Sequence, residues 1–186
     1  HHEPKSIRAD ATQVETPDDM KSLHEPEPAT IKRVELLTDK ETLFEVALDS
    51  GKPLGHDPGQ FVEVSVWGHG EAPISVSSAP GGDTFELVVR KVGDVTNKLH
   101  TLREGDKVGI RGPFGRGFDT EGLKGRDLLF IAGGLGMVPM RSLINHVRNN
   151  RQDYGKVTIL YGCKTPSELL FCDEVECWDA CEDIVH

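Results

Sequence analysis

The feature that most constrains the fold is a change in hydrophobic pattern near Gly125. After it, "RDLLFIAGG" is a continuous apolar run that ends in glycine, and "KVTILYG" is a second run of the same kind. Between them, "MVPMRSLINHVRNN" spaces its apolar residues as a helix does, and "PSELLFCDEVECWDAC" predicts another helix with Pro166 near its start. This strand–helix–strand–helix order predicts a parallel sheet with crossover helices over residues 125–186.

Residues 28–124 carry a different pattern. Segments such as "TIKRVELLTD", "QFVEVSVWG" and "TFELVVRKV" are short and partly alternate apolar with polar residues, and clusters of Gly, Pro and Asp separate them. This pattern predicts a small antiparallel barrel or sandwich. Residues 1–27 are polar and rich in Glu, Asp and Pro, so they predict a tail or an extended arm.

The predicted parallel part is short for its type. Only two complete strands with their helices follow Gly125, before "DIVH" begins what reads as a third strand. Two such units do not cover both faces of a parallel sheet. We therefore expect a second domain that is cut short, in a fragment or in a chain that needs a partner.

Composition excludes some classes of function. The formal net charge of -10 argues against a nucleic-acid partner, because phosphate backbones bind basic surfaces. No apolar run approaches the roughly 20 residues of a membrane span, and the first residues show no secretory signal pattern. We expect a cytoplasmic protein with reduced thiols, since its four cysteines all lie in the last quarter of the chain.

The stretch "FIAGGLGMVPM" ends a predicted strand with Gly133, Gly134 and Gly136 and leads into a predicted helix. Glycines there let a ligand approach the backbone, and a helix start favours a pyrophosphate. Pro139 suits the first turn of that helix. A plain strand-to-helix turn without a ligand is the alternative. Lys164 stands where an acidic residue would normally hold a ribose, which leaves room for a 2′-phosphate or for an exposed lysine without a role.

Five stretches together resemble the ferredoxin–NADP reductase superfamily. They occur in the family's order as "DPGQFVEV", "APISVSSAP", "VVRKVGDVTNKLHTLREGDKVGIRGPFGRGF", "IAGGLGMVPMRSLI" and "YGCKTPSELLF". Within it, the chain is most similar to flavoprotein subunits of multi-subunit redox enzymes: those of sulfhydrogenase (its gamma subunit), of anaerobic sulfite reductase, and of dihydroorotate dehydrogenase (its electron-transfer subunit). The resemblance implies a Greek-key barrel that binds FAD, followed by a parallel α/β domain that binds NAD(P)H. It also implies an iron–sulfur partner that receives the electrons singly.

The resemblance also assigns residues. Ser75, next to Pro73 and Ile74, is placed near the reacting flavin nitrogen and is the candidate catalytic residue. The other cofactor-binding candidates are Val89, Arg90 and Lys91 along the flavin, Gly93, Val95 and Thr96 at its pyrophosphate, Gly133, Gly134, Leu135, Gly136, Met137 and Pro139 at the nicotinamide nucleotide, and Lys164 near its adenosine half. For the Thr96 segment, a hairpin turn followed by a short helix capped by Thr96 is the alternative.

Two positions depart from the family pattern. Ala72 replaces the arginine that usually binds a flavin phosphate, so another residue must supply that charge. Ile74 replaces the tyrosine that stacks on the flavin ring, as it does in the dihydroorotate-type subunits.

The cysteines do not predict a metal site. Related subunits carry a [2Fe–2S] cluster on a Cys-rich loop beyond the nucleotide domain, so its ligands are expected past His186. Cys172, Cys177 and Cys181 fall inside a predicted helix, which favours thiols packed on a helix face over cluster ligands.

Three functions remain open at this point. The first is an electron-transfer subunit that passes electrons between NAD(P)H and an iron–sulfur partner of the hydrogenase or sulfite reductase kind. The second is a regulatory or docking subunit that binds no nicotinamide. The third is a stand-alone NAD(P)H:acceptor reductase.

Overall fold

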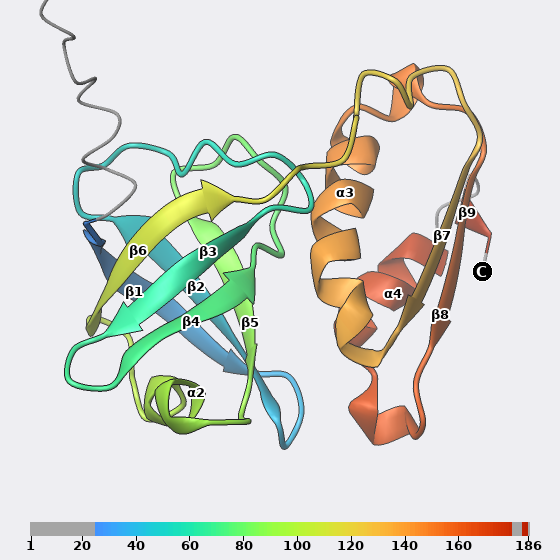
Figure 1. Ribbon diagram of the computed structural model, residues 1–186. Helices are drawn as coiled ribbons and strands as arrows, with labels where there is room; N and C mark the ends of the chain where they lie inside the picture. The colour runs from blue at the N-terminus through green and yellow to red at the C-terminus, as the bar shows by residue number, and fades with distance from the viewer. Residues whose placement is uncertain (1–24, 180–183, 186) are drawn as a thin grey trace, which may run out of the picture.

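The computed structural model describes residues 25–179 and 184–185 as two halves, one antiparallel and one parallel. Figure 1 shows the two halves side by side. The antiparallel half contains β1 (Glu27–Leu36), β2 (Glu41–Leu48), β3 (Phe61–Val66), β4 (Gly70–Ser75), β5 (Phe85–Arg90), α2 (Asp94–Leu99) and β6 (Lys107–Phe114). The parallel half contains β7 (Leu128–Gly133), η1 (Gly134–Gly136), α3 (Met137–Asn149), η2 (Arg151–Asp153), β8 (Val157–Gly162), η3 (Pro166–Glu168), α4 (Cys172–Asp179) and β9 (Ile184–Val185).

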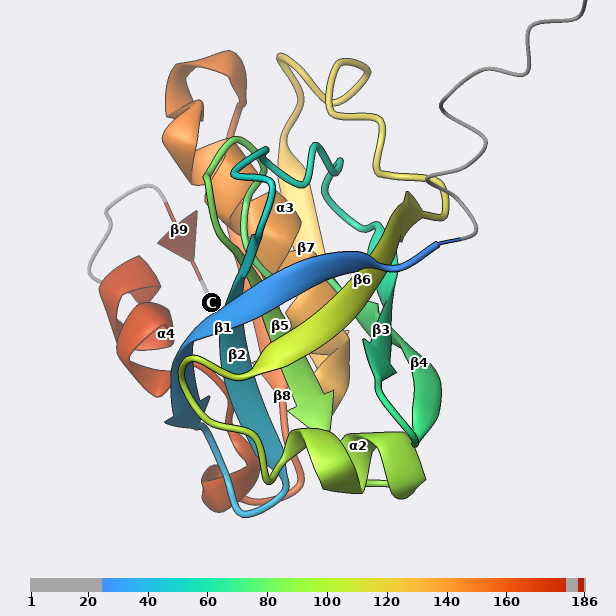
Figure 2. The same ribbon diagram turned by 90° about the vertical axis from the view of Figure 1, so that its left-hand side faces the viewer.

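The antiparallel half is one curled six-stranded sheet with the strand order β4-β3-β6-β1-β2-β5. Its edge strands come together only at an isolated bridge between Val76 and Leu87, so the expected barrel is present but not fully closed. The alternating sequence pattern puts one face inside, as Val62, Val64 and Val66 of β3 show. α2 lies across one end of the curled sheet (Figure 2).

The parallel half confirms the predicted strand–helix–strand order. β7 and β8 pair in parallel from Leu128 with Val157 to Gly133 with Gly162, and α3 makes the crossover between them. α3 and α4 lie between this sheet and the antiparallel half (Figure 1). Leu129 and Ile131 of β7 point the other way and are 60% and 65% exposed, so among the described residues only one face of this sheet is covered.

The last helix differs from its prediction. α4 begins at Cys172 rather than near Pro166, because η3 ends at Glu168 and Phe171 has a φ of 59°, outside the helical range. The buried side chains of this segment are those of Leu170 and Phe171, which precede α4, and of Trp178 within α4. Cys172 and Cys177 of α4 are exposed, so they are not packed as expected. Cys181 lies outside the described residues.

No helix in the described part of the chain is long and apolar enough to cross a bilayer.

His56 is a buried polar residue of the antiparallel half, and it contacts a carbonyl that also bonds to α3. Its imidazole is 4% exposed, and its Nε2 lies 3.0 Å from the carbonyl oxygen of Ser78. The same carbonyl accepts a hydrogen bond of 2.6 Å from the Ser142 hydroxyl of α3. Burial lowers the pKa of His56 below its ordinary value of 6.5, although the bond to Ser78 partly opposes this.

We expect His56 to make stability fall with decreasing pH. In the unfolded chain the imidazole takes up a proton near pH 6.5, whereas the folded protein resists protonation because its pKa is lowered. The unfolded state therefore binds more protons below this pH, and the free energy of unfolding decreases as the pH falls. His56→Gln should remove this dependence in urea unfolding between about pH 7.5 and about pH 5.5. The exposed His69→Gln should retain it, and equal slopes in wild type and His56→Gln would contradict the expectation.

Candidate functional site

A cavity of about 550 Å³ lies where the two halves meet. Its wall from the antiparallel half comes from β4, β5 and the start of α2, and its other wall comes from the glycine turn and the first turn of α3. The lining residues are Ala72, Pro73, Ile74, Ser75, Val88, Arg90, Val92 and Thr96 on one side and Leu135, Gly136, Val138 and Pro139 on the other. A ligand here would be held by both halves.

A second cavity of about 690 Å³ adjoins the first, since Arg90, Leu135 and Gly136 line both. Its other lining residues are Lys40, Gly133, Gly134, Gly162, Cys163, Lys164 and Glu168. Three cationic side chains and one carboxylate therefore surround it, and the carboxylate of Glu168 lies 3.6 Å from the Lys40 ammonium. This excess of positive charge suits an anionic ligand.

The glycine turn opens toward the second cavity. A Cβ added at Gly134 or Gly136 would meet no atom within 4 Å, and one at Gly133 would meet only the carbonyl of Gly162 at 3.9 Å. Gly134 also has a φ of 49°, which favours glycine. α3 starts directly after this turn without a side-chain cap, so its first N–H groups and its positive dipole end lie beside the cavity.

Tyr161 of β8 supports the glycine turn through its hydroxyl. Its hydroxyl donates to the carbonyl of Gly134 at 3.3 Å and accepts the N–H of Leu170 at 3.1 Å. Burial raises the pKa of this phenol, so it stays a hydrogen-bond donor. Met137 is fully buried after the turn and packs in the core of the parallel half, and the ligand contact predicted for it stays a prediction.

Arg90 separates the two cavities and is held by a buried acid. Its Nε donates to Glu41, whose side chain is 2% exposed and which also accepts the hydroxyl of Thr38. The guanidinium makes no other side-chain hydrogen bond within the described part of the chain. Glu41 thus orients the guanidinium toward the cavities. This arrangement makes Arg90 a candidate for the positive charge that the family arginine, replaced here by Ala72, would have supplied to a flavin phosphate.

Strand alternation decides which residues of β5 reach the site. Val88 and Arg90 line the first cavity, whereas Val89 points into the core of the antiparallel half and is 1% exposed. The carbonyl of Val89 is also engaged, because the His100 Nε2 lies 2.8 Å from it. The side chain of Val89 therefore lies away from the cavities, and the flavin contact predicted for Val89 stays a prediction. Lys91 is exposed and lines neither cavity.

The Gly93 segment forms a helix start, but Thr96 is not its cap. α2 begins at Asp94 after Gly93, and Thr96 lies inside the first turn. The Thr96 hydroxyl accepts the N–H groups of Val92 at 3.0 Å and Gly93 at 2.9 Å and donates to the Gly93 carbonyl at 3.0 Å. Thr96 lines the first cavity with its hydroxyl engaged, while Gly93 and Val95 line neither cavity.

The structure brings the remaining predicted residues together. Pro73, Ile74, Ser75 and Pro139 line the first cavity and Gly133, Gly134 and Lys164 the second, with Arg90, Leu135 and Gly136 between them. Sequence reasoning missed Lys40 and Glu168 as wall residues and Glu41 as the support of Arg90. Lys40 and Glu41 lie in the β1–β2 hairpin, where a charged turn residue carries no signal of a site about 90 residues away along the chain.

Two family models match the two halves. Residues 28–118 match the oxidoreductase FAD-binding domain, and residues 130–183 match the oxidoreductase NAD-binding domain.

Curated relatives cover most of this chain. It is 41% identical over 150 residues to sulfhydrogenase 2 subunit gamma of Pyrococcus furiosus. The matched region covers 79% of this chain and 52% of that protein. It is 38% identical over 159 residues to a probable dihydroorotate dehydrogenase B (NAD(+)), electron transfer subunit, of Methanothermobacter thermautotrophicus. Here the matched region covers 84% of this chain and 56% of that protein. The chain spans about half the length of the curated relatives it matches.

Solved structures share the fold at lower identity. The flavohem-like FAD/NAD binding domain of nitric oxide dioxygenase from Vibrio cholerae has a TM-score of 0.73 and 21% identity, covering 87% of this chain and 78% of that chain. Ferredoxin–NADP+ reductase from Plasmodium falciparum has a TM-score of 0.75 and 18% identity, covering 87% of this chain and 69% of that chain.

Arg90→Met should destabilise the protein, because it leaves the buried Glu41 carboxylate without its cationic partner. We expect a loss of about 1–3 kcal/mol in the free energy of unfolding. Adding Glu41→Gln should recover part of this loss, since a neutral amide costs less to bury than an unpaired charge. Urea unfolding of the two single variants and the double variant measures both effects. Arg103→Met, at an exposed arginine, is the control; an Arg90→Met midpoint equal to that of wild type would refute the role of the pair.

Proposed function

The chain belongs to the ferredoxin–NADP reductase superfamily, as an oxidoreductase FAD-binding domain followed by an oxidoreductase NAD-binding domain, and we propose that it is the flavoprotein electron-transfer subunit of a multi-subunit redox enzyme. In this proposal it passes electrons between NAD(P)H and an iron–sulfur partner of the hydrogenase or sulfite reductase kind. The relatives named as a gamma subunit and an electron transfer subunit support this assignment.

The observation that carries the proposal is the pair of adjoining cavities. The first cavity has β4, β5 and α2 of the FAD-binding domain on one side and the start of α3 on the other, and the second surrounds the glycine turn of the NAD-binding domain. Two cofactors placed there meet at Arg90, Leu135 and Gly136. A bound flavin supplies a hydride acceptor that releases electrons singly, and a nicotinamide nucleotide supplies the hydride.

The residues present fit such cofactors. Open space at Gly134 and Gly136 lets a pyrophosphate approach the start of α3, and Lys40, Arg90 and Lys164 offset its charge. Ser75 ends β4 at the wall of the first cavity, and in this proposal its hydroxyl donates a hydrogen bond to the flavin. The apolar side chains around it would exclude water from the reacting atoms of bound cofactors. The chain's part in the reaction is therefore to orient two cofactors.

The choice of nucleotide depends on the rim of the second cavity. Lys164 would favour a 2′-phosphate, whereas the Glu168 carboxylate would oppose it and could accept a ribose hydroxyl. Tests of the proposal therefore compare NADH with NADPH.

The onward electron acceptor is proposed to be an iron–sulfur centre, including a [2Fe–2S] cluster, outside residues 1–186. Within the described part of the chain, no group of three or more His, Cys, Asp or Glu side chains is arranged to hold a metal ion. We also propose a cytoplasmic location, which the exposed free thiols of Cys163, Cys172 and Cys177 support, because an oxidising compartment favours pairing of such thiols.

The flavin assignment predicts a yellow protein and a role for Ser75. The purified chain should bind FAD in about equimolar amount, and Ser75→Ala should slow flavin reduction by NADH or NADPH about tenfold, the effect of losing about one hydrogen bond. Flavin affinity should change little, because Ser75→Ala leaves the cavity walls in place. Anaerobic stopped-flow absorbance measures the rate.

Ser65→Ala is the matched control, since Ser65 bonds to Glu71 on the outer face of the sheet and lines neither cavity. A colourless protein that takes up no added FAD would refute the flavin assignment and favour a docking subunit, in keeping with Ala72 at the place of the family arginine.

Glycine substitutions can distinguish which cofactor each cavity binds. Gly162 lines only the second cavity and its Cβ would meet no atom, so Gly162→Val should fold normally and weaken nucleotide binding at least about tenfold. FAD uptake should be unchanged. Gly136→Val projects into both cavities and should impair both cofactors. Titrations of each variant with NADH, NADPH and FAD test this pattern; unchanged nucleotide affinity in Gly162→Val would place the nucleotide elsewhere.

A further inference from the structure

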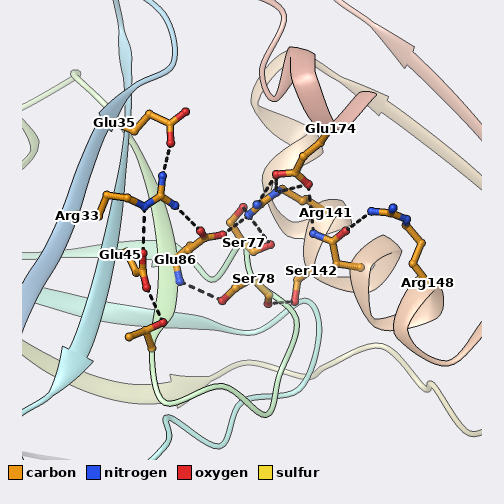
Figure 3. Close-up of polar contacts among 12 residues, drawn as sticks. Arg33, Glu35, Glu45, Ser77, Ser78, Glu86, Arg141, Ser142, Arg148 and Glu174 are labelled. Atoms are coloured by element: carbon orange, nitrogen blue, oxygen red, sulfur yellow. Dashed lines mark hydrogen bonds and ion pairs between the residues drawn. The ribbon is translucent and has the colours of Figure 1, made fainter. Parts of the chain in front are cut away.

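Arg141 is a buried cation at the junction of the two domains. It lies on α3, two residues after Pro139 of the cavity wall, and its side chain is 8% exposed. One terminal nitrogen donates to the Glu86 carboxylate at 2.5 Å and to the Ser77 hydroxyl at 3.1 Å (Figure 3). Its Nε donates to both oxygens of Glu174 on α4, at 2.8 and 3.0 Å. Arg141 thus contacts one carboxylate from each domain.

The contacts on the FAD-binding domain lead directly to the first cavity. Glu86, Val88 and Arg90 lie on one face of β5 because side chains alternate along a strand, and the last two line the cavity. Ser77 follows Ser75 by two residues. The neighbouring Ser142 hydroxyl adds a second link by donating to the carbonyl of Ser78 at 2.6 Å. α3 is therefore bonded to both segments that carry the opposite wall.

We propose that Arg141 is a positioning residue for hydride transfer. It acts by setting the distance between the two walls of the first cavity. This inference rests on the proposed function. Arg141 lines neither of the two cavities and touches no reacting atom, so its effect passes through Glu86 and Ser77 to the wall that carries Ser75 and Arg90.

The geometry around Glu86 makes this link rigid. One Glu86 oxygen accepts Arg141 and the other accepts Arg33 at 2.9 Å, and Arg33 also donates to Glu45 at 3.0 Å (Figure 3). Burial lowers the pKa of Arg141, but the hydrogen bonds and charges of Glu174 and Glu86 outweigh it and raise the pKa above its ordinary value. The guanidinium therefore stays charged. Its planar group donates hydrogen bonds to two carboxylates in fixed directions, which the ammonium of a lysine does not do.

The two carboxylates allow a matched comparison. Glu86 links Arg141 to the FAD-binding domain, whereas Glu174 links it to α4 of its own domain and receives more of its hydrogen bonds. Glu86→Gln and Glu174→Gln each neutralise one partner while keeping the side chain's shape. Glu86 also accepts Arg33 and is the more buried of the two carboxylates, so urea unfolding of both variants measures their losses of stability. A merely structural role would make the fall in reduction rate follow the loss of stability in each variant.

The positioning role predicts that the reduction rate depends on Glu86 and not on Glu174, whatever the two losses of stability are. In anaerobic stopped-flow experiments, Glu86→Gln should lower the limiting rate of flavin reduction by the nicotinamide on the order of 10- to 100-fold, the cost of misplacing reactants by about 1 Å. Nucleotide affinity should stay within about threefold of wild type. Any long-wavelength absorption from stacked nicotinamide and flavin should weaken with the rate. Glu174→Gln should reduce at nearly the wild-type rate.

A second readout needs no cofactor. In the free protein, amide hydrogen exchange of the segment around Ser77, whose N–H bonds to the carbonyl of Glu86 at 2.8 Å, should be on the order of tenfold faster in Glu86→Gln and unchanged in Glu174→Gln. A wild-type reduction rate in Glu86→Gln, or an equal loss in Glu174→Gln, would overturn the positioning role. If the wild-type chain binds no flavin, the proposed function fails, and unchanged exchange in Glu86→Gln separately refutes the link.

Discussion

The guanidinium of Arg141 joins carboxylates from the two domains, and the arrangement of the cavities depends on it. A buried cation with two acidic partners tolerates little displacement, because moving one domain would leave a charge unpaired in a poorly solvated place. Its partners Glu86 and Glu174 come from β5 and α4, so a single side chain connects three elements that are distant in the sequence. The Phe171 ring, 4.5 Å from the guanidinium, packs against its flat face and adds to this constraint.

The same design recurs at Arg90. A buried acid, Glu41, holds the cation at the boundary of the two cavities, so that charge is available there without a flexible side chain. The glycine turn contributes the other part of the site, since it removes side chains where a ligand must approach the backbone and starts a helix beside that place. One domain therefore supplies an oriented charge, the other an open backbone, and the site is complete only where they meet.

Local patterns carried much of this architecture. Alternating segments predicted the antiparallel sheet, and Leu143, Ile144 and Val147 predicted α3 correctly because helical spacing is visible in any short window. The glycines before Met137 marked the turn for the same reason. The start of α4 was missed because Phe171 adopts a positive φ beneath Arg141, a conformation that tertiary contact stabilises against local preference. The choice of Val88 over Val89 as a cavity residue needed knowledge of which face of β5 the core occupies.

The sequence by itself determined the class of each half, the position of the glycine turn and most residues around it, because periodicity and glycine act within a few residues. The tertiary structure alone decided that Glu41 supports Arg90, that Lys40 reaches the second cavity, and that Arg141 bonds to Glu86 and Ser77 across the domain junction. These pairs lie tens of residues apart along the chain, and a charged residue has the same local signature whether it is solvated or buried against a partner. Folding brings the partners together, and only then does the cost of burying a charge select which of them pair.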